Sequence, residues 1–280
     1  MQLRKVQKKK TKLKIGIASP SGFGKTYSSL LMAYGMVGDW GKVAIIDTEN
    51  GSADLYEDLG GYQVLPLAPP YSPERYIEAI DTCVSAGMEV IIVDSITHEW
   101  SGTGGILDIK EQMGGSFAVW AKLKPRHQKF VDKILQSPIH VITTVRKKQE
   151  YEMYKDDKGK NKVEKKGMKE ETSPGFEYEL TLNLEILNEN HYAAASKDRT
   201  GLFDGNPEFV ITEETGKQLI AWANAGVDEV EEMEMAFTAV TTLDELKETG
   251  KKYLHMKNNP RYMKAGSQAK ERVTPKAQAS

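Results

Sequence analysis

A glycine-rich segment near the N-terminus has the residue types of a phosphate-binding loop. It occupies residues 19–26 and reads Ser-Pro-Ser-Gly-Phe-Gly-Lys-Thr. Its glycines let backbone N–H groups turn toward phosphate oxygens, and a helix that begins at Lys25 adds partial positive charge. In such loops the lysine reaches the β- and γ-phosphates of ATP, and the threonine hydroxyl binds Mg²⁺. The expected contacts with ATP and Mg²⁺ are Ser21, Gly22, Phe23, Gly24, Lys25, Thr26 and Tyr27.

The neighbours of this segment favour the same interpretation. Residues 13–18 form an apolar run that predicts a buried strand, and residues 27–34 predict a helix. Strand, glycine-rich loop and helix, in this order, are the context of a P-loop. The loop departs from the usual pattern at its first position, because Ser19 stands where glycine is usual. A glycine-rich turn that binds nothing is the alternative.

Carboxylates follow two further predicted strands. Asp94 ends the apolar run 90–93, and Glu49 lies just beyond the run that ends at Asp47. The carboxyl ends of parallel strands face the ligand crevice. We therefore expect Asp94 to hold Mg²⁺ together with Thr26, and Glu49 to orient and deprotonate the attacking water. Asp47 competes with Glu49 for this role, although its place in the strand favours a structural one.

The next predicted strand leads into a lysine-rich segment. It ends with Thr143, Thr144 and Arg146, which either sense the γ-phosphate or are an ordinary threonine pair and a solvated arginine. Residues 147–171 carry mixed charge and no core of their own, which predicts a loop or hairpin. Tyrosines between lysines suit stacking and charge contacts with single-stranded DNA, although loop packing explains the tyrosines equally well. The candidate DNA contacts are Lys147, Lys148, Tyr151, Tyr154 and Lys155.

The whole chain has the composition of a soluble globular protein. Its 280 residues are 39% hydrophobic and 28% charged, with a net charge of −2, so any nucleic-acid surface must be local. Cys83 is the only cysteine, which excludes an intramolecular disulfide and a cysteine-rich zinc site and suits a reducing cytoplasm. No apolar run approaches the length of a membrane span. The basic residues 1–11 are either a solvated arm or an arm that contacts phosphates.

The order of the predicted elements indicates an α/β fold. Strands that alternate with helices predict a mostly parallel sheet with helices on both faces. Alternating apolar residues at 178–186 and a return strand at 191–196 predict a late antiparallel hairpin. Helical patterns follow, and the last residues are polar. The expected organisation is a basic arm at 1–11, a core at 12–226, a helical appendage at 227–264 and a disordered tail at 265–280.

Several motifs together resemble the RecA-like ATPases. In chain order they are Gly-Phe-Gly-Lys-Thr, Ile-Asp-Thr-Glu-Asn-Gly, Ile-Ile-Val-Asp-Ser and Lys-Asp-Arg-Thr-Gly. The set is most similar to the phage Sak-type group of single-strand annealing and recombination proteins, over residues 12–203. The resemblance implies a RecA-like P-loop NTPase core in which Glu49 is the catalytic glutamate. It also implies that Lys197 and Arg199 reach the nucleotide of a neighbouring subunit. Residues 147–171 take the place of DNA-binding loops.

The expected function is that of a DNA-stimulated ATPase that binds single-stranded DNA and promotes annealing or strand exchange in phage-type recombination. The resemblance further implies a homo-oligomer, ring or filament, in the cytoplasm of a bacterial host, and admits a single-strand-binding protein as a partner. Two alternatives remain. One is a nucleotide-gated scaffold that loads a replication or recombination protein. The other is a P-loop kinase of a small molecule, which would need an acceptor pocket and an arginine-rich lid.

Overall fold

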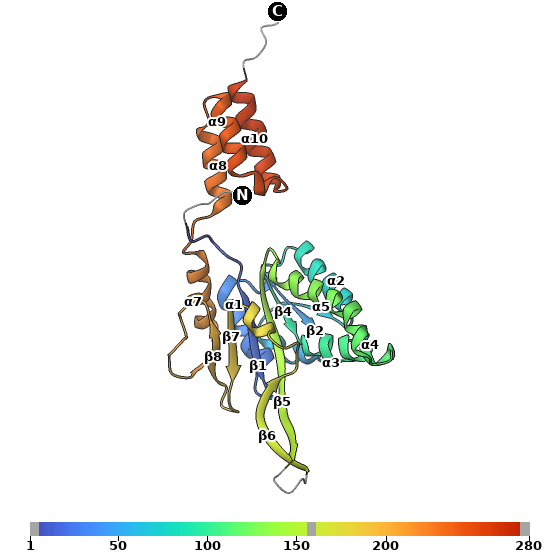
Figure 1. Ribbon diagram of the computed structural model, residues 1–280. Helices are drawn as coiled ribbons and strands as arrows, with labels where there is room; N and C mark the ends of the chain where they lie inside the picture. The colour runs from blue at the N-terminus through green and yellow to red at the C-terminus, as the bar shows by residue number, and fades with distance from the viewer. Residues whose placement is uncertain (1–5, 156–160, 275–280) are drawn as a thin grey trace, which may run out of the picture. The chain divides into compact units, whose positions relative to one another are not determined.

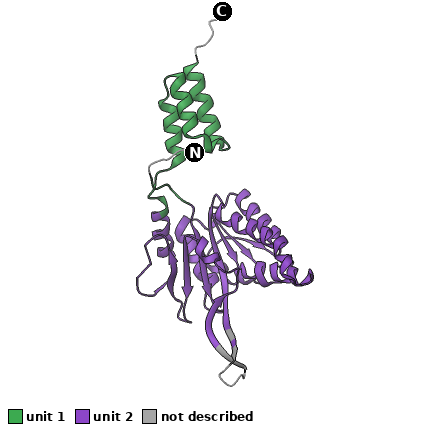
Figure 2. Ribbon diagram, viewed as in Figure 1, with its two compact units in different colours: residues 1–11, 223–280 green, residues 12–222 purple. Residues whose placement is uncertain are grey.

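The computed structural model describes residues 6–155 and 161–274 (Figure 1). Its contacts divide the chain into two units, one of residues 12–222 and one of residues 1–11 together with 223–280 (Figure 2). The larger unit contains all the residues singled out above for ATP, Mg²⁺ and DNA. Within the described ranges, no helix has both the length and the apolar character needed to cross a membrane.

A mostly parallel sheet forms the centre of the larger unit, in the strand order β3-β2-β4-β5-β1-β7-β8-β9. From β3 to β7 in this order the strands pair in parallel, whereas β7–β8 and β8–β9 pair antiparallel. β6 lies off this path and pairs antiparallel with β5, so these two strands extend from the sheet as a hairpin (Figure 1). The bounds are β1 (Lys14–Ser19), β2 (Val43–Asp47), β3 (Gln63–Pro66), β4 (Val90–Asp94), β5 (His140–Lys155), β6 (Asn161–Glu170), β7 (Leu182–Ile186), β8 (Tyr192–Asp198) and β9 (Phe209–Val210).

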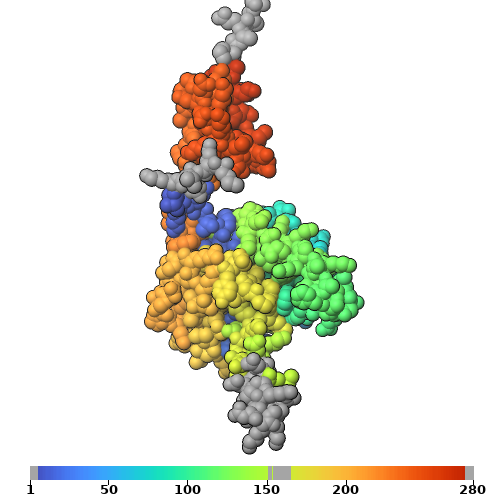
Figure 3. Space-filling model, viewed as in Figure 1, coloured from blue at the N-terminus to red at the C-terminus, as the bar shows by residue number. Residues whose placement is uncertain are grey.

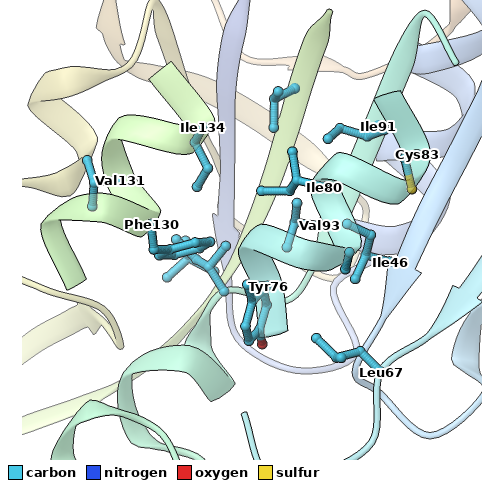
Figure 4. Packing of buried hydrophobic residues seen from close by; sticks show 14 of the residues in the cluster. Ile46, Leu67, Tyr76, Ile80, Cys83, Ile91, Val93, Phe130, Val131 and Ile134 are labelled. Carbon is cyan, nitrogen blue, oxygen red and sulfur yellow. The ribbon is translucent and has the colours of Figure 1, made fainter. Parts of the chain in front are cut away.

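Helices cover both faces of the parallel strands, because these strands are apolar on both sides. On one face, Tyr76 and Ile80 of α2 and Phe130 of α5 pack against alternate strand residues such as Ile46 and Val93 (Figure 4). Helix α1 packs against β1, β2, β4 and β5. The predicted fold, with its late antiparallel hairpin, is confirmed. The helices of this unit are α1 (Lys25–Val37), α2 (Pro73–Ser85), α3 (Thr97–Ser101), α4 (Ile106–Gln112), α5 (Trp120–Leu135), α6 (Phe176–Glu179) and α7 (Glu213–Asn224), with the 3₁₀ turns η1 (Trp40–Lys42), η2 (Ser52–Leu59) and η3 (Phe117–Val119).

The register of the sheet brings several strand ends to one edge. Ser19 at the end of β1 is level with Arg146 of β5, and Asp47 at the end of β2 is level with Asp94 of β4. Helices α4 and α5, drawn green, and the segments after β6, drawn yellow to orange, form different flanks of this unit (Figure 3). The sheet therefore positions residues from distant parts of the sequence around the start of α1.

Lys14 places an amino group inside the larger unit. Its Nζ donates to the backbone oxygens of Ser137 (2.8 Å) and Ile139 (2.7 Å), and the residue is 5% exposed. Burial, and to a smaller extent the charge of Lys12, lowers the pKa of Lys14 from 10.5 to about 7. Between about pH 7 and pH 10 the unfolded chain therefore binds more protons at this residue than the folded chain does. The free energy of unfolding should rise with pH across this window.

Replacing Lys14 tests this expectation. In Lys14→Met the rise should be smaller, by at most about 1.4 kcal/mol per pH unit. Urea unfolding near pH 7 and near pH 9.5 measures it in both proteins. The comparison isolates Lys14, because Lys25, whose pKa burial lowers to about 8, is present in both. If the two proteins gain the same stability with pH, Lys14 does not titrate in this window.

The smaller unit is built from α8 (Glu229–Ala239), α9 (Leu243–Lys252), the 3₁₀ turn η4 (Leu254–Met256) and α10 (Pro260–Val273). These helices pack around Phe237 and Tyr253, among other apolar residues. The prediction of disorder from residue 265 is therefore wrong as far as Val273. The Asn259 side chain accepts from the Arg261 N–H at 2.9 Å at the start of α10, and Ala269 is fully buried. Residues 275–280 lie outside the described ranges.

Part of the predicted basic arm belongs to this smaller unit. The Nζ atoms of Lys9 and Lys10 pair with Glu229 (2.6 Å) and Asp228 (3.3 Å). The backbone N–H of Lys10 also donates to the Val227 oxygen at 2.9 Å. Neither lysine is freely solvated, because acidic residues at the start of α8 pair with both, and a phosphate contact by the arm stays a prediction. Residues 1–5 lie outside the described ranges.

Candidate active site

A cavity of about 500 Å³ opens where β1 ends and α1 begins, a size within the range of small-molecule sites. Most of the residues predicted to hold ATP and Mg²⁺ meet there. Phe23 does not line the cavity, and its backbone oxygen instead lies 2.9 Å from Nδ1 of His191. The predicted residues that line the cavity are Ser21, Gly22, Gly24, Lys25, Thr26, Tyr27, Glu49 and Asp94, and Ser52, Tyr56, Arg146 and His191 complete the lining.

The P-loop has the backbone that its glycines permit. Gly22 and Gly24 have φ values of 86° and 87°, in the left-handed region that other residues rarely adopt. Lys25 then begins α1, so the first N–H groups of the helix face the same loop. Such a nest of N–H groups at a helix N-terminus attracts phosphate.

Lys25 folds back onto the P-loop. Its Nζ donates to the oxygens of Pro20 (3.0 Å) and Ser19 (3.3 Å), and to the Ser19 hydroxyl oxygen (3.4 Å). Burial lowers the pKa of Lys25 to about 8, partly opposed by the nearby Asp94 carboxylate. A phosphate would offer the ammonium a charged acceptor in place of these neutral ones. Ser19, the departure from the usual pattern, thus supplies a hydroxyl that holds the lysine.

The Thr26 and Asp94 side chains lie together at the helix start. Thr26 Oγ1 donates to Oδ2 of Asp94 at 2.5 Å, and Thr144 Oγ1 donates to Oδ1 at 2.5 Å. Asp94 is 1% exposed, and burial raises its pKa. Hydroxyl and carboxylate oxygens fit Mg²⁺, which takes its other ligands from phosphates and water in nucleotide sites. When bound, Mg²⁺ would offset phosphate charge, and Thr144 would keep one oxygen of Asp94 directed at Thr26.

Glu49 faces the cavity but is engaged by neighbouring residues. Its Oε1 accepts from the Ser95 hydroxyl (2.9 Å) and from Nε of Arg146 (3.0 Å), and its Oε2 pairs with the Arg146 guanidinium. Asp47 instead accepts from the backbone N–H groups of Glu49 (2.6 Å) and Ala53 (3.2 Å), so it shapes the loop between them. Arg146 is therefore not a freely solvated arginine. For Glu49 to act as the predicted base, the Arg146 guanidinium would have to release its carboxylate.

Comparison with known proteins identifies the family to which this chain belongs. The sequence profile of a family described as an AAA domain matches residues 11–264. The chain belongs to this family. A search of curated proteins gives no match to this AAA-domain chain. Among solved structures it is similar to a KaiC-like protein of the hyperthermophilic archaeon Pyrococcus horikoshii, with 14% identity and a TM-score of 0.42, over 72% of this chain and 86% of that chain.

The family and the strand order agree on a RecA-like P-loop ATPase fold. In this AAA-domain chain, β5 lies between the P-loop strand β1 and the strand β4 that ends in Asp94. A carboxylate in position to activate a water, a hydroxyl–carboxylate pair that fits Mg²⁺ and a glycine-rich phosphate loop line one cavity, which is the set of groups that ATP hydrolysis requires.

Lys197 and Arg199 are the predicted catalytic residues that the AAA-domain chain does not bring to its own cavity. Lys197 is level with Asn183 of β7, and the Arg199 N–H donates to the Thr181 oxygen, so both lie near the beginning of β7. The P-loop lies at the opposite edge, beyond the end of β1. Lys197 Nζ donates to the Leu180 oxygen at 2.6 Å, and Arg199 donates to the Tyr178 oxygen at 2.8 Å.

The residue between the two cations does not pair with them. The Asp198 carboxylate accepts from the N–H (2.6 Å) and hydroxyl (2.6 Å) of Thr200 and from the N–H of Phe203 (2.8 Å). These bonds close the turn after β8 and lower the pKa of Asp198 against the opposing effect of burial. Asp198 therefore fixes the turn, while the two neighbouring cations contact only neutral carbonyls among the bonds described for them.

The candidate DNA contacts divide into three cases. The Lys147 side chain is 9% exposed and its ammonium pairs with Glu185, so its prediction as a surface contact is wrong. Lys148 is 67% exposed and pairs with Glu171 at 2.6 Å. The side chains of the remaining three candidates, Tyr151, Tyr154 and Lys155, lie outside the described part of the structure.

Ser52, Tyr56 and His191 line the cavity and Ser95 contacts Glu49 beside it, and none of the four was predicted. Tyr56 packs against Tyr27 at a ring-centroid distance of 5.7 Å and offers an aromatic surface where a planar base could stack. Its only sequence signal is its position shortly after Glu49. Ser95 follows Asp94 directly, and its hydroxyl holds Glu49. His191 has no signal near the P-loop sequence, because the sheet alone brings it there.

Proposed function

We propose that this ATPase couples ATP hydrolysis to the binding of single-stranded DNA on the β5–β6 hairpin, and promotes annealing or strand exchange in recombination of the phage Sak type. One observation carries the proposal. Arg146 belongs both to the cavity and to the base of the hairpin, and its guanidinium holds Glu49. A movement of the hairpin base would therefore change the state of the candidate catalytic base.

The backbone around Arg146 supports this coupling. Its N–H donates to the Thr97 hydroxyl at 2.9 Å, and its oxygen accepts from the N–H of Glu171 at 2.8 Å. Thr97 begins α3, the short helix that follows Asp94, whereas Glu171 follows the returning strand β6. The residue that holds Glu49 is thus a part of β5 that is bonded to the helix after Asp94 and to the residue that follows β6.

Two further contacts join α3 to the segment after β6. The Ser101 hydroxyl donates to Glu171 at 3.0 Å. The His127 ring lies between Glu99 (3.0 Å from Nδ1) and the Ser173 hydroxyl (2.8 Å from Nε2). Glu99 is 1% exposed, so its contact with His127 is shielded from water. Buried networks of this kind hold their elements in one arrangement.

The exposed lysines of the described part of the hairpin form weak ion pairs, and a polyanion such as DNA could compete for these lysines. Lys148 and Lys169 pair with Glu171 and Glu150, and both lysine side chains are more than half exposed. Exposed pairs contribute only about 0–1 kcal/mol each. A DNA phosphate can therefore replace a glutamate at modest cost, and its binding would disturb Glu171 next to Arg146.

Shortening the hairpin tests the proposal. Glu150 pairs with Gly167, so replacing residues 151–166 by Asn-Gly should close a tight turn and leave Arg146 and its contacts in place. We expect wild-type ATP turnover to rise with single-stranded DNA, and DNA affinity to fall steeply with salt. The shortened protein should keep its turnover without DNA and lose both the stimulation and the DNA affinity.

The other outcomes separate the alternative functions. Stimulation that survives in the shortened protein would place the DNA site elsewhere. Wild-type turnover that does not change with DNA would favour a nucleotide-gated scaffold or loader, whose hairpin binds a protein. The mixed Lys–Glu charge of the described hairpin residues is the observation that favours this second candidate. A small-molecule kinase is disfavoured, because Arg146 is the sole arginine among the described residues that line the cavity.

A further inference from the structure

His191 reaches the P-loop from a strand far along the chain. β7 pairs in parallel with β1, and Ala18 is level with Glu185, so the turn that follows β7 comes to the edge where the P-loop begins. His191 lies in that turn, and its ring lines the cavity. Its Nδ1 is 2.9 Å from the backbone oxygen of Phe23 in the middle of the P-loop.

This contact determines which ring nitrogen of His191 carries a hydrogen and how the Phe23–Gly24 peptide is oriented. A carbonyl oxygen only accepts hydrogen bonds, so Nδ1 of His191 carries a hydrogen and donates it to Phe23. The C=O of Phe23 and the N–H of Gly24 belong to one peptide unit, and in a trans peptide the two groups point in opposite directions. Holding the Phe23 oxygen therefore directs the Gly24 N–H away from His191. Backbone N–H groups of this loop are the donors that phosphate requires.

The turn that presents His191 is itself well held. The Asn188 side-chain oxygen accepts from the N–H groups of Asn190 (3.0 Å) and Tyr192 (3.3 Å), and the His191 N–H donates to the Asn188 oxygen (3.0 Å). His191 has a φ of 63°, in the left-handed region that few residues other than glycine adopt, although asparagine, aspartate and histidine are enriched there. Residues held in this region on a firm turn are often associated with function.

The approach is also too close for a larger residue on the P-loop side. A Cβ added at Gly24 would lie 2.8 Å from Nδ1 of His191. Gly24 thus serves two purposes: it adopts a positive φ, and it lets the imidazole reach the neighbouring carbonyl. The loop and the turn fit each other as one assembly.

We propose that His191 is a positioning residue of the nucleotide site, which orients the Phe23–Gly24 peptide so that its N–H can bind a phosphate of the nucleotide. This inference rests on the P-loop ATPase function. It assigns to the β7–β8 turn a share in nucleotide binding within the same chain, in addition to the P-loop sequence itself.

Three variants separate the hydrogen bond from the backbone conformation. His191→Gly keeps the positive φ and removes the donor. His191→Asn keeps a donor, since its amide nitrogen takes nearly the place of Nδ1, and asparagine tolerates this φ. His191→Ala loses the donor and strains the backbone. Thermal unfolding without nucleotide shows whether each variant folds as the wild type does.

Titration with a fluorescent ADP analogue gives the decisive measurement. His191→Gly should raise the dissociation constant about three- to tenfold, the worth of one hydrogen bond, and His191→Asn should restore it to within about twofold. In steady-state assays KM should rise with little change in kcat, because the lost contact stabilises the bound nucleotide equally in the ground state and in the transition state. Amide exchange at Gly24 should be faster in the glycine variant than in the asparagine variant.

The outcomes distinguish this inference from the proposed function. Wild-type affinity in a folded His191→Gly protein would overturn the role of His191 alone. Equal weakening in the glycine and asparagine variants would also overturn it, since the donor would then be irrelevant. A wild-type protein that binds no nucleotide would overturn the nucleotide site itself and this inference with it.

Discussion

A mixture of two inactive variants should regain ATPase activity. The first is Lys197→Ala/Arg199→Ala, which keeps its P-loop; the second is Lys25→Ala, which keeps its two cations after β8. Each variant alone should lose most of its turnover, because cations at the γ-phosphate contribute about 10³–10⁵ in rate in related chemistry and the P-loop lysine holds the phosphates. If the subunits mix at random, about a quarter of the interfaces pair an intact P-loop with intact cations.

The sheet explains why Lys197 and Arg199 would act on a neighbour's nucleotide and not on their own chain's nucleotide. Arg199 is bonded to Thr181 at the beginning of β7, and Thr181 is bonded to Lys14 at the beginning of β1. The P-loop follows Ser19, five residues further along β1, so about 15 Å of strand separates the two levels. The Lys197 ammonium and the Arg199 guanidinium donate hydrogen bonds to the carbonyl oxygens of Leu180 and Tyr178. A neighbour's phosphates are stronger acceptors than these carbonyls.

The matched control is Lys217→Ala. This lysine is exposed on α7, pairs with Glu214 at 3.5 Å and should be dispensable. Mixing Lys217→Ala with Lys25→Ala should give about the activity of the first protein alone, reduced by dilution. Size-exclusion chromatography with light scattering must show that the variants assemble together. If co-assembled mixtures stay as inactive as their components, the assignment of Lys197 and Arg199 to a neighbour's site is wrong.

Glu49→Gln should slow hydrolysis by about 10²–10⁴ while nucleotide affinity stays close to that of the wild type. The amide cannot take a proton from water, yet it occupies the same volume beside Ser95. The phosphate loop and the Thr26–Asp94 pair are untouched, so binding should persist. Slowed turnover with retained nucleotide binding, measured on one preparation, is the expected result.

Glu57→Gln is the control for this substitution. Glu57 lies in η2, which follows Glu49 in the chain, and it is exposed to solvent, so its charge can be removed without touching the cavity. It should hydrolyse ATP as the wild type does. Equal losses of affinity and turnover in Glu49→Gln would instead assign Glu49 a role in holding Arg146 and the loop, and would remove it from proton transfer.

The sequence predicts the site where short-range rules apply. Lys25 and Thr26 follow from the loop pattern, and Asp94 and Glu49 follow because parallel strands end at one edge. His191 could not be predicted, since nothing in its neighbourhood reveals that β7 pairs with β1. Local sequence likewise shows Lys147 as one of several lysines, whereas its partner Glu185 lies 38 residues away on another strand.

The helical C-terminus illustrates a different limit. α10 is polar overall, with apolar contacts confined to a few positions such as Tyr262, Ala265 and Ala269. Their spacing of three and four residues is helical, but three small contacts weigh little against a polar composition. Packing against Phe237 of α8 supplies the missing stabilisation. Tertiary contacts of this kind cannot be predicted from the sequence of the segment alone.

Strand β8 has a consequence for any assembly of this protein. It begins beside His191 at the chain's own phosphate loop and ends between Lys197 and Arg199, seven residues later, a span of about 20 Å. In an assembly joined through those two cations, successive nucleotides would be spaced by one rigid strand and its flanking turns. The distance between successive nucleotides would then be set by the length of β8, and it would not depend on how many copies join.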